Sequence, residues 1–288
     1  MIKMIASDLD GTLFDDQKNI SDNNRKAVAE AAAHGISFVP VTGRPFGAIP
    51  DNVRSLPGVR YIAAASGAVI VDLEKDEIIH EALIPNALML EILKTLVAGD
   101  YVVMVFIDGV GYVSREGMER AIEMAPDDAT RRYYRQYRVS VDDLYEFTRS
   151  NGRDVEKFTV NFPYDDNGKL IGEAACREVL RPFENELHMV SGGNINLEVG
   201  CAEAHKGAAL DVLAVRLGIE NDEILALGDS GNDSDMVGHC GIFAAVANGE
   251  DTLKAMADRI VPANGEDGVA VAIRELALGD TSQMQDHR

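Results

Sequence analysis

The sequence contains only three cysteines and no tryptophan among its 288 residues. Cys176, Cys201 and Cys240 are widely spaced and form no CxxC pair, so they indicate neither a disulfide framework nor a zinc site. A reducing, cytoplasmic location is therefore expected. No apolar stretch reaches the roughly 20 residues that a membrane-spanning helix needs, and the first residues do not read as a signal peptide.

Positive charge is also scarce, because 27 Lys and Arg stand against 48 Asp and Glu, giving a net charge of −21. Nucleic acid and anionic membranes would on average be repelled by such a chain, so neither is expected as a partner. A small phosphorylated molecule is compatible with this charge if a local cation offsets the field. The hydrophobic content of 46% is that of a globular protein.

Apolar runs alternate with helical segments towards both ends of the chain. Strands are expected at 2–7, 36–41, 61–65, 224–228, 242–246 and 259–261. Helices are expected from a Ser21 cap, from Pro45 to Leu56, and from Lys206. Continuous apolar strands that alternate with helices are typical of a parallel sheet covered on both faces. The predicted fold class is therefore α/β, with a Rossmann-like, doubly wound parallel sheet.

The pattern between these two regions is different. Shorter strands follow one another closely, and Asp108-Gly109 is a hairpin signal, which together favour an antiparallel sheet. We expect an inserted α+β domain at residues 83–190. The parallel-sheet domain then consists of residues 1–82 and 191–288.

Polar clusters follow the strand ends of the predicted parallel sheet. They are Asp8-Leu9-Asp10, Thr42-Gly43-Arg44, the helix start at Lys206, and the segment Asp229-Ser230-Gly231-Asn232-Asp233. Ligands of such sheets bind outside the carboxyl ends of the strands, so these clusters are expected to converge.

Four carboxylates in one crevice would repel one another strongly. Asp8, Asp10, Asp229 and Asp233 therefore predict a hard divalent cation, and Mg²⁺ with its oxygen ligands fits best. The alternative interpretation is that each aspartate merely caps a helix or a turn.

Anion-binding groups accompany the carboxylates. Thr42 offers a hydroxyl, Gly43 lets backbone N–H groups approach an anion, and Lys206 begins a helix. Arg44 either reaches the substrate or pairs with an acid at the rim. The simpler interpretation is an ordinary Thr-Gly loop and a solvent-exposed lysine.

Four segments of the chain together resemble the four motifs of the haloacid dehalogenase (HAD) superfamily. They are Asp8-Leu9-Asp10-Gly11-Thr12, Thr42-Gly43-Arg44, Lys206 and the segment 228–233. The second aspartate, Asp10, is similar to that of its phosphatase branch. The insert resembles the C2 cap of the Cof-type subfamily. Ser66-Gly67 departs from the Asn-Gly that such proteins commonly carry after the third strand.

This resemblance implies a mechanism. Asp8 would form an aspartyl-phosphate, and Asp10 would first protonate the leaving alcohol and then activate water. Asp8, the Asp10 backbone carbonyl and Asp229 would hold Mg²⁺. Asp233 would orient Lys206 or a water on the metal. The groups implied to bind the transferring oxygens are the Leu9 N–H, Thr42, Gly43, Lys206 and Asn232.

The expected function is a Mg²⁺-dependent phosphomonoester hydrolase that acts on small phosphorylated metabolites, with sugar phosphates first. Two alternatives stay open: a phosphomutase of the same superfamily and a non-catalytic phospholigand-binding module. A monomer or weak homodimer is the default assembly.

The run from Arg131 to Arg138, RRYYRQYR, is both basic and aromatic. Such a run stacks on bases in some nucleic-acid-binding proteins. A helix or loop that packs its tyrosines and solvates its charges is the favoured interpretation, and contact with the distal part of a substrate is a third.

Overall fold

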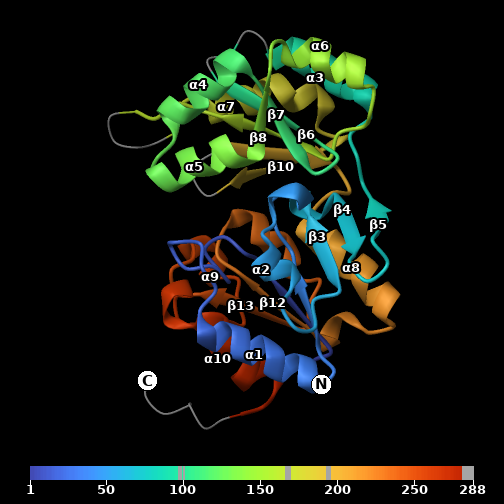
Figure 1. Ribbon diagram of the computed structural model, residues 1–288, viewed down its shortest axis with the longest axis vertical. Coiled ribbons are helices and arrows are strands. Elements are labelled where there is room, and N and C mark those ends of the chain that lie inside the picture. The colour runs from blue at the N-terminus through green and yellow to red at the C-terminus, as the bar shows by residue number, and fades with distance from the viewer. Residues whose placement is uncertain (97–98, 100, 166–169, 193–195, 281–288) are drawn as a thin grey trace. The chain divides into compact units, whose positions relative to one another are not determined.

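The computed structural model describes residues 1–96, 99, 101–165, 170–192 and 196–280 (Figure 1). The chain divides into two compact units. The first unit comprises residues 1–43, 49–80 and 206–288, and the second comprises residues 44–48 and 81–205. The second unit thus extends to His205, beyond the end expected at 190, and includes a short segment that begins at Arg44.

A five-stranded parallel sheet of order β14-β13-β12-β1-β2 forms the centre of the first unit. Its strands are β1 (Met4–Ser7), β2 (Ser37–Pro40), β12 (Ile224–Gly228), β13 (Ile242–Val246) and β14 (Arg259–Val261). On one face Met4, Ala226 and Phe243 belong to a buried cluster with α8 (Lys206–Leu217). The alternate residues Ile5 and Leu225 are also fully buried, so both faces are covered. The predicted doubly wound α/β sheet is confirmed.

The other helices of this unit are α1 (Asp22–Ala33), α2 (Asp51–Arg54), α9 (Asp251–Lys254) and α10 (Gly268–Ala272), which a π-helical turn over Ile273–Ala277 continues. Ser21 caps α1 as predicted, because its side chain accepts a hydrogen bond from the Asn24 N–H. The single helix predicted from Pro45 to Leu56 is wrong. A 3₁₀ turn at Phe46–Ala48 precedes α2, and Pro50 separates them because a residue before proline avoids helical geometry.

A second, three-stranded sheet contains β3 (Tyr61–Ala64), β4 (Val69–Asp72) and β5 (Glu77–Glu81). The strand predicted at 61–65 exists, but it pairs antiparallel with β4, and an isolated bridge joins Val41, just after β2, to Ala63. The turn between β3 and β4 holds Ala65 and Ser66 at φ of 51° and 62°, a region that favours glycine.

The second unit contains a six-stranded sheet of order β10-β11-β9-β6-β7-β8. Its strands are β6 (Val102–Ile107), β7 (Val110–Ser114), β8 (Arg138–Val141), β9 (Lys157–Asn161), β10 (Leu187–Gly192) and β11 (Asn196–Cys201). All neighbours pair antiparallel except β7 and β8. Asp108 and Gly109 form the predicted β6–β7 hairpin turn, at φ of 51° and 74°. Because β11 pairs with β9 and β10, it belongs to this sheet.

In the described part of the chain, the α-helices of this unit are α3 (Asn86–Leu96), α4 (Arg115–Met124), α5 (Asp128–Tyr137), α6 (Leu144–Asn151) and α7 (Glu173–Leu180). Met104 and Phe106 on β6 pack in one buried cluster with Ala121 of α4 and Tyr134 of α5. Within this unit, α3 and α6 lie side by side (Figure 1). Among the described residues, no helix combines the length and the apolar character needed to cross a membrane.

Candidate active site

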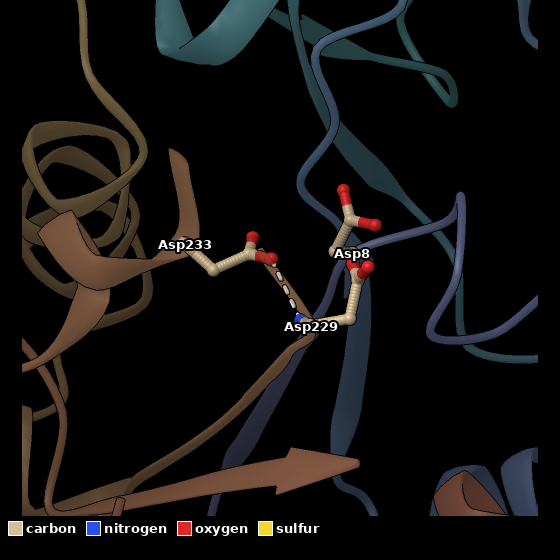
Figure 2. Close-up of side chains that lie close together, drawn as sticks. All are labelled: Asp8, Asp229 and Asp233. Carbon is tan, nitrogen blue, oxygen red and sulfur yellow. Dashed lines mark hydrogen bonds between the residues drawn. The ribbon is translucent and has the colours of Figure 1, made fainter. Parts of the chain in front are cut away.

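Two neighbouring strands of the parallel sheet position the first two carboxylates. The register pairs Ser7 of β1 with Leu227 of β12, and the Asp8 N–H donates to the Leu227 carbonyl at 3.0 Å. Asp8 and Asp229 therefore leave the same edge of the sheet immediately after the two strands end. Figure 2 shows their carboxylates close together.

A buried lysine joins Asp8 to a third carboxylate. Lys206, the first residue of α8, places its Nζ atom 2.6 Å from Asp8 Oδ1 and 2.6 Å from Asp233 Oδ1. The second oxygen of Asp233 accepts the backbone N–H groups of Asp229 and Ser230 at 2.9 and 3.1 Å. These hydrogen bonds hold together Asp8, Lys206 and the loop at residues 229–233, which are far apart in the sequence.

Burial controls the ionisation of these groups. Asp8 is 5% exposed, and Lys206 and Asp233 are fully buried. Burial raises the pKa of Asp8, and Asp233 adds to this while Lys206 opposes it. Burial also raises the pKa of Asp229, with Asp8 and Asp233 adding to the effect. For Lys206 burial favours the neutral amine, but Asp233 and Asp8 outweigh it and raise the pKa.

The donor set fits a hard cation. Asp8, Asp229 and Asp233 each offer a carboxylate oxygen within 4.8 Å of the others. With all groups ionised, three carboxylates and one lysine leave a charge of −2, which one divalent cation would cancel. Both oxygens of Asp233 already accept hydrogen bonds, one from Lys206 and the other from two backbone N–H groups. The better metal ligands are therefore Asp8 and Asp229.

A glycine shapes this cradle. Gly11 has a φ of +88°, and a Cβ atom there would lie 2.4 Å from Asp229 Oδ2. The Thr12 hydroxyl donates to the other oxygen of Asp229 at 3.3 Å. The turn after β1 therefore holds the Asp229 carboxylate in place and requires glycine to do so.

Asp10 is not one of the three carboxylates that lie within 4.8 Å of one another, but its charge adds to the rise in the pKa of Asp8. Its side chain is 37% exposed, and its Oδ1 atom lies 2.9 Å from Lys18 Nζ. Exposure gives this carboxyl access to solvent, and the exposed ion pair with Lys18 contributes little to stability.

The other predicted binding residues occupy different positions. Leu9 is fully buried, and the Thr42 N–H donates to the Ala63 carbonyl at 2.9 Å. Gly43 and Asn232 are half-buried, and the Asn232 Oδ1 atom accepts the Ser230 hydroxyl at 3.1 Å.

Arg44 groups with the second unit rather than with Gly43. Its guanidinium donates to the Ala48 carbonyl at 3.2 Å and lies over the Tyr133 ring.

Thr12, Lys18 and Asn248 are neighbours of the site to which the sequence alone gave no role. The Asn248 Nδ2 atom donates to the Gly11 carbonyl at 2.8 Å, and its Oδ1 atom accepts the Asn264 N–H at 2.8 Å. These two hydrogen bonds connect the turn after β1, which contains Asp10, to the segments around Asn248 and Asn264. Thr12 was visible in the first motif, whereas nothing in the sequence marks Lys18 or Asn248 as its neighbours.

Comparisons with known proteins agree with this geometry. The family model described as haloacid dehalogenase-like hydrolase matches residues 5–273. A 5-amino-6-(5-phospho-D-ribitylamino)uracil phosphatase of Bacillus subtilis, YcsE, is 30% identical over 279 residues, which cover 96% of each chain. A phosphoglycolate phosphatase of Methanothermobacter thermautotrophicus is 27% identical and covers 95% of this chain and 98% of its own.

A solved structure shows the same fold over almost the whole length. A haloacid dehalogenase-like hydrolase from B. subtilis superimposes with a TM-score of 0.80 at 27% identity. The match covers 96% of this chain and all of the other.

Proposed function

The chain belongs to the haloacid dehalogenase-like hydrolases, as its four motifs predicted, and is a phosphatase; we propose that it is a Mg²⁺-dependent phosphomonoesterase that works through an aspartyl-phosphate on Asp8. The observation that carries this proposal is the buried contact of Lys206 with Asp8 and Asp233 at 2.6 Å each. A lysine held between two carboxylates beside Asp229 supplies a fixed positive charge where a phosphoryl group would arrive.

In the first step Asp8 is the nucleophile. Lys206 holds its Oδ1 atom, which orients the second oxygen, Oδ2, for attack in line on phosphorus. The O–P bond to Asp8 forms as the P–O bond to the alcohol breaks, and Asp10 gives its proton to the departing oxygen. Because Asp8 is buried, little water competes for this carboxylate.

In the second step Asp10 acts as a base. It takes a proton from a water molecule that attacks phosphorus, which releases inorganic phosphate and restores Asp8. The 37% exposure of Asp10 suits both tasks, because the leaving alcohol and the incoming water must reach the same carboxyl. The weak ion pair with Lys18 opens at little cost when a substrate arrives.

Other groups hold the transferring oxygens and the metal. The phosphoryl oxygens would be bound by the Thr42 hydroxyl, Lys206, Asn232 and the N–H groups of Leu9 and Gly43. Arg44 would reach the rest of the substrate. Asp8, Asp229 and the Asp10 carbonyl would hold Mg²⁺, and Asp233 would keep Lys206 in place. When bound, the ion neutralises charge on the phosphoryl oxygens.

The substrate is proposed as a small phosphorylated metabolite, with sugar phosphates first. The two relatives are named for different substrates, a phosphoribitylamino-uracil and phosphoglycolate, so neither is transferred to this chain. A cytoplasmic location is part of the proposal, and Cys176, Cys201 and Cys240 are free thiols, as a reducing compartment would keep them.

The test is phosphate release from a panel of phosphorylated metabolites, with and without Mg²⁺, by the wild type and by Asp8→Asn. The variant should lose at least roughly 10³-fold in kcat, because the nucleophile is gone. Asp251→Asn is the matched control, since that side chain is 98% exposed on α9.

Wild-type turnover by Asp8→Asn, with an unchanged circular dichroism spectrum, would refute the role of Asp8. Phosphate release without a sugar acceptor separates the hydrolase from a phosphomutase.

A further inference from the structure

Two asparagines from neighbouring loops hold the turn that carries Asp10. The Asn248 Nδ2 atom donates to the Gly11 carbonyl at 2.8 Å. The Asn264 Nδ2 atom donates to the Phe14 carbonyl at 2.9 Å. The Asn264 backbone N–H donates to Asn248 Oδ1 at 2.8 Å, so the two asparagines are also joined to each other. We call Asn248 and Asn264 the asparagine pair; they and the turn belong to the first unit.

The turn between Asp10 and Phe14 closes on itself. The Phe14 N–H donates to the Leu9 carbonyl at 2.8 Å, and an isolated β-bridge pairs Asp10 with Phe14. Thr12, within the same turn, donates its hydroxyl to Asp229 at 3.3 Å. Because the backbones of Asp10 and Phe14 are paired, a hydrogen bond that holds the Phe14 carbonyl also restrains Asp10.

The order of the strands explains why these loops reach the turn. Asn248 follows the end of β13, and Asn264 follows the end of the neighbouring strand β14. Between β13 and β1 lies β12, which ends just before Asp229. The Glu250 N–H donates to the Asp229 carbonyl at 2.8 Å, and a Cβ atom on Gly249 would lie 2.8 Å from the same oxygen. The loop after β13 therefore passes the end of β12 closely, and Gly249 permits this approach.

The hydrogen bonds of the asparagine pair are specific. The Asn248 oxygen accepts an N–H and its nitrogen donates to a carbonyl, so reversing this amide would lose both bonds. Asn264 is 8% exposed and also donates to Asp16 Oδ1 at 3.4 Å. Water can replace the bond of the exposed Asn248, whereas the bond from Asn264 to Phe14 is buried. Asn264 is therefore the more important member of the pair.

The Asp10 carboxyl depends on its backbone for its position. Its side chain is short and 37% exposed, and its ion pair is with the exposed Lys18. Exposed ion pairs of this kind hold a side chain only weakly. A general acid must lie within hydrogen-bond reach of the leaving oxygen, and a small displacement lowers its effect. Restraining the turn is therefore an effective way to place this carboxyl.

We propose that Asn248 and Asn264 are positioning residues for Asp10, because they fix the turn after β1 so that the Asp10 carboxyl meets the leaving oxygen. The proposal rests on the proposed function, in which the proton of Asp10 passes to the alcohol oxygen as the bond of that oxygen to phosphorus breaks. The asparagine pair acts on the reaction through Asp10, whereas Lys206 holds the nucleophile Asp8 itself.

The leaving group reveals whether the pair acts through Asp10. An alkyl phosphomonoester releases a basic alkoxide that needs a proton, whereas p-nitrophenyl phosphate releases a stable phenolate that does not. At saturating Mg²⁺, Asn264→Ala should lower kcat/KM for the best alkyl phosphomonoester of the substrate panel by about tenfold, out of the roughly 10²–10⁴-fold that acid catalysis supplies. For p-nitrophenyl phosphate the loss should stay below about twofold. A general loosening of the site would lower both values equally.

Asn248→Ala is the second variant, and its fold is secure because Asn248 is exposed. It should show the same selective loss at a smaller size, about threefold, since water can take the place of the missing donor.

Asn86→Ala is the matched control. The side-chain amide of Asn86 also donates to two backbone carbonyls, those of Thr148 and Arg153, but in the second unit. Its loss weakens the local structure in a similar way and should leave the ratio of the two kcat/KM values unchanged.

Asp10→Asn separates this proposal from the proposed function. It should lose alkyl phosphomonoesters selectively and to a greater extent than Asn264→Ala. If it spares both substrates, the role of Asp10 in the proposed function is overturned. If Asp10→Asn is selective but Asn264→Ala and Asn248→Ala lower both substrates equally, or neither, the asparagine pair has no positioning role and the phosphatase proposal stands.

A double variant gives an independent check. Adding Asn264→Ala to Asp10→Asn should cost less than about a further twofold in kcat/KM, because the carboxyl that the pair places is already gone. A further loss of about tenfold would show that Asn264 acts by another route and would overturn the proposal.

Discussion

Each unit of the molecule buries a lysine, and the surroundings of the two lysines are opposite. The side chains of Lys206 and Lys157 are 0% and 3% exposed. Lys206 contacts two carboxylates at 2.6 Å with Asp229 beside them, whereas Lys157 contacts one, Glu198, at 2.9 Å and lies over the Phe106 ring. Around Lys206 negative charge is in excess; around Lys157 the charges cancel.

A buried ion pair is therefore not by itself a sign of function. A balanced pair satisfies its own charges and needs no ligand. An unbalanced charge inside a protein is costly. Such a charge is expected where a bound ligand of the opposite charge neutralises it. The excess carboxylates near Lys206 suit a cation.

The largest expected contrast comes from making the same substitution at both lysines. Lys206→Met should lower kcat by roughly 10²–10³-fold, because a fixed charge at the transferring phosphoryl group is lost. Lys157→Met should keep the kcat of the wild type and lose stability only, since it leaves the buried Glu198 without its partner.

Phosphate-release assays and urea unfolding of both variants measure the two effects. Similar losses of kcat in both variants would contradict this distinction between the two lysines, because a balanced pair would then matter to catalysis as much as an unbalanced one.

A second prediction concerns pH and metal. Because burial raises the pKa of Asp8 and Asp229, the folded protein without metal binds protons that the unfolded chain has released. The stability that these groups contribute is complete below the ordinary carboxyl range and is lost as the pH rises above about 4 towards the raised values. Mg²⁺ should restore it, and its stabilising effect should grow with pH.

Thermal melts of protein treated with a chelator, with and without Mg²⁺ across this pH range, measure the effect. Asp229→Asn should remove the dependence on Mg²⁺, and Asp251→Asn should keep it. A metal effect that stays constant with pH would contradict the excess of carboxylate charge.

The smallest expected effect uses two glycines with similar backbones. Gly11 and Gly35 have φ of +88° and +76°, but only Gly11 faces a carboxylate, and a Cβ atom on Gly35 meets nothing within 4 Å. Gly35→Ala should cost about 1 kcal/mol of unfolding free energy from the backbone alone. Gly11→Ala should cost as much and also displace Asp229.

The measurement is the Mg²⁺ concentration that gives half-maximal activity. It should rise in Gly11→Ala and stay unchanged in Gly35→Ala. An unchanged value in both variants would show that the turn after β1 does not shape the metal cradle.

Much of the fold follows from local sequence signals. The apolar runs predicted β1, β2, β12 and β13, and Ser21 and Asp108-Gly109 predicted a helix start and a hairpin turn. The antiparallel pairing of β3 with β4 was missed, because its turn puts Ala65 and Ser66, rather than Gly or Asn, at positive φ. Its stability comes from tertiary contacts that no local pattern reports.

For the candidate site, the sequence indicated which residues gather but not how they pair. Adjacent parallel strands must bring Asp8 and Asp229 to one edge, so their proximity was predictable. The ion pair of Asp10 with Lys18 and the bond from Asn248 to Gly11 depend on loops whose paths are set by the whole fold. The location of Arg44 over Tyr133 was equally beyond sequence reasoning.

The short segment 44–48 has a consequence for engineering. It packs with the second unit, where the Gly47 N–H donates to the Gly109 carbonyl at 3.1 Å, although both of its chain neighbours belong to the first. Transplanting residues 81–205 into another scaffold would therefore leave part of the unit behind. A chimera that exchanges inserts between relatives must carry both pieces, and the interrupted piece begins directly after Gly43.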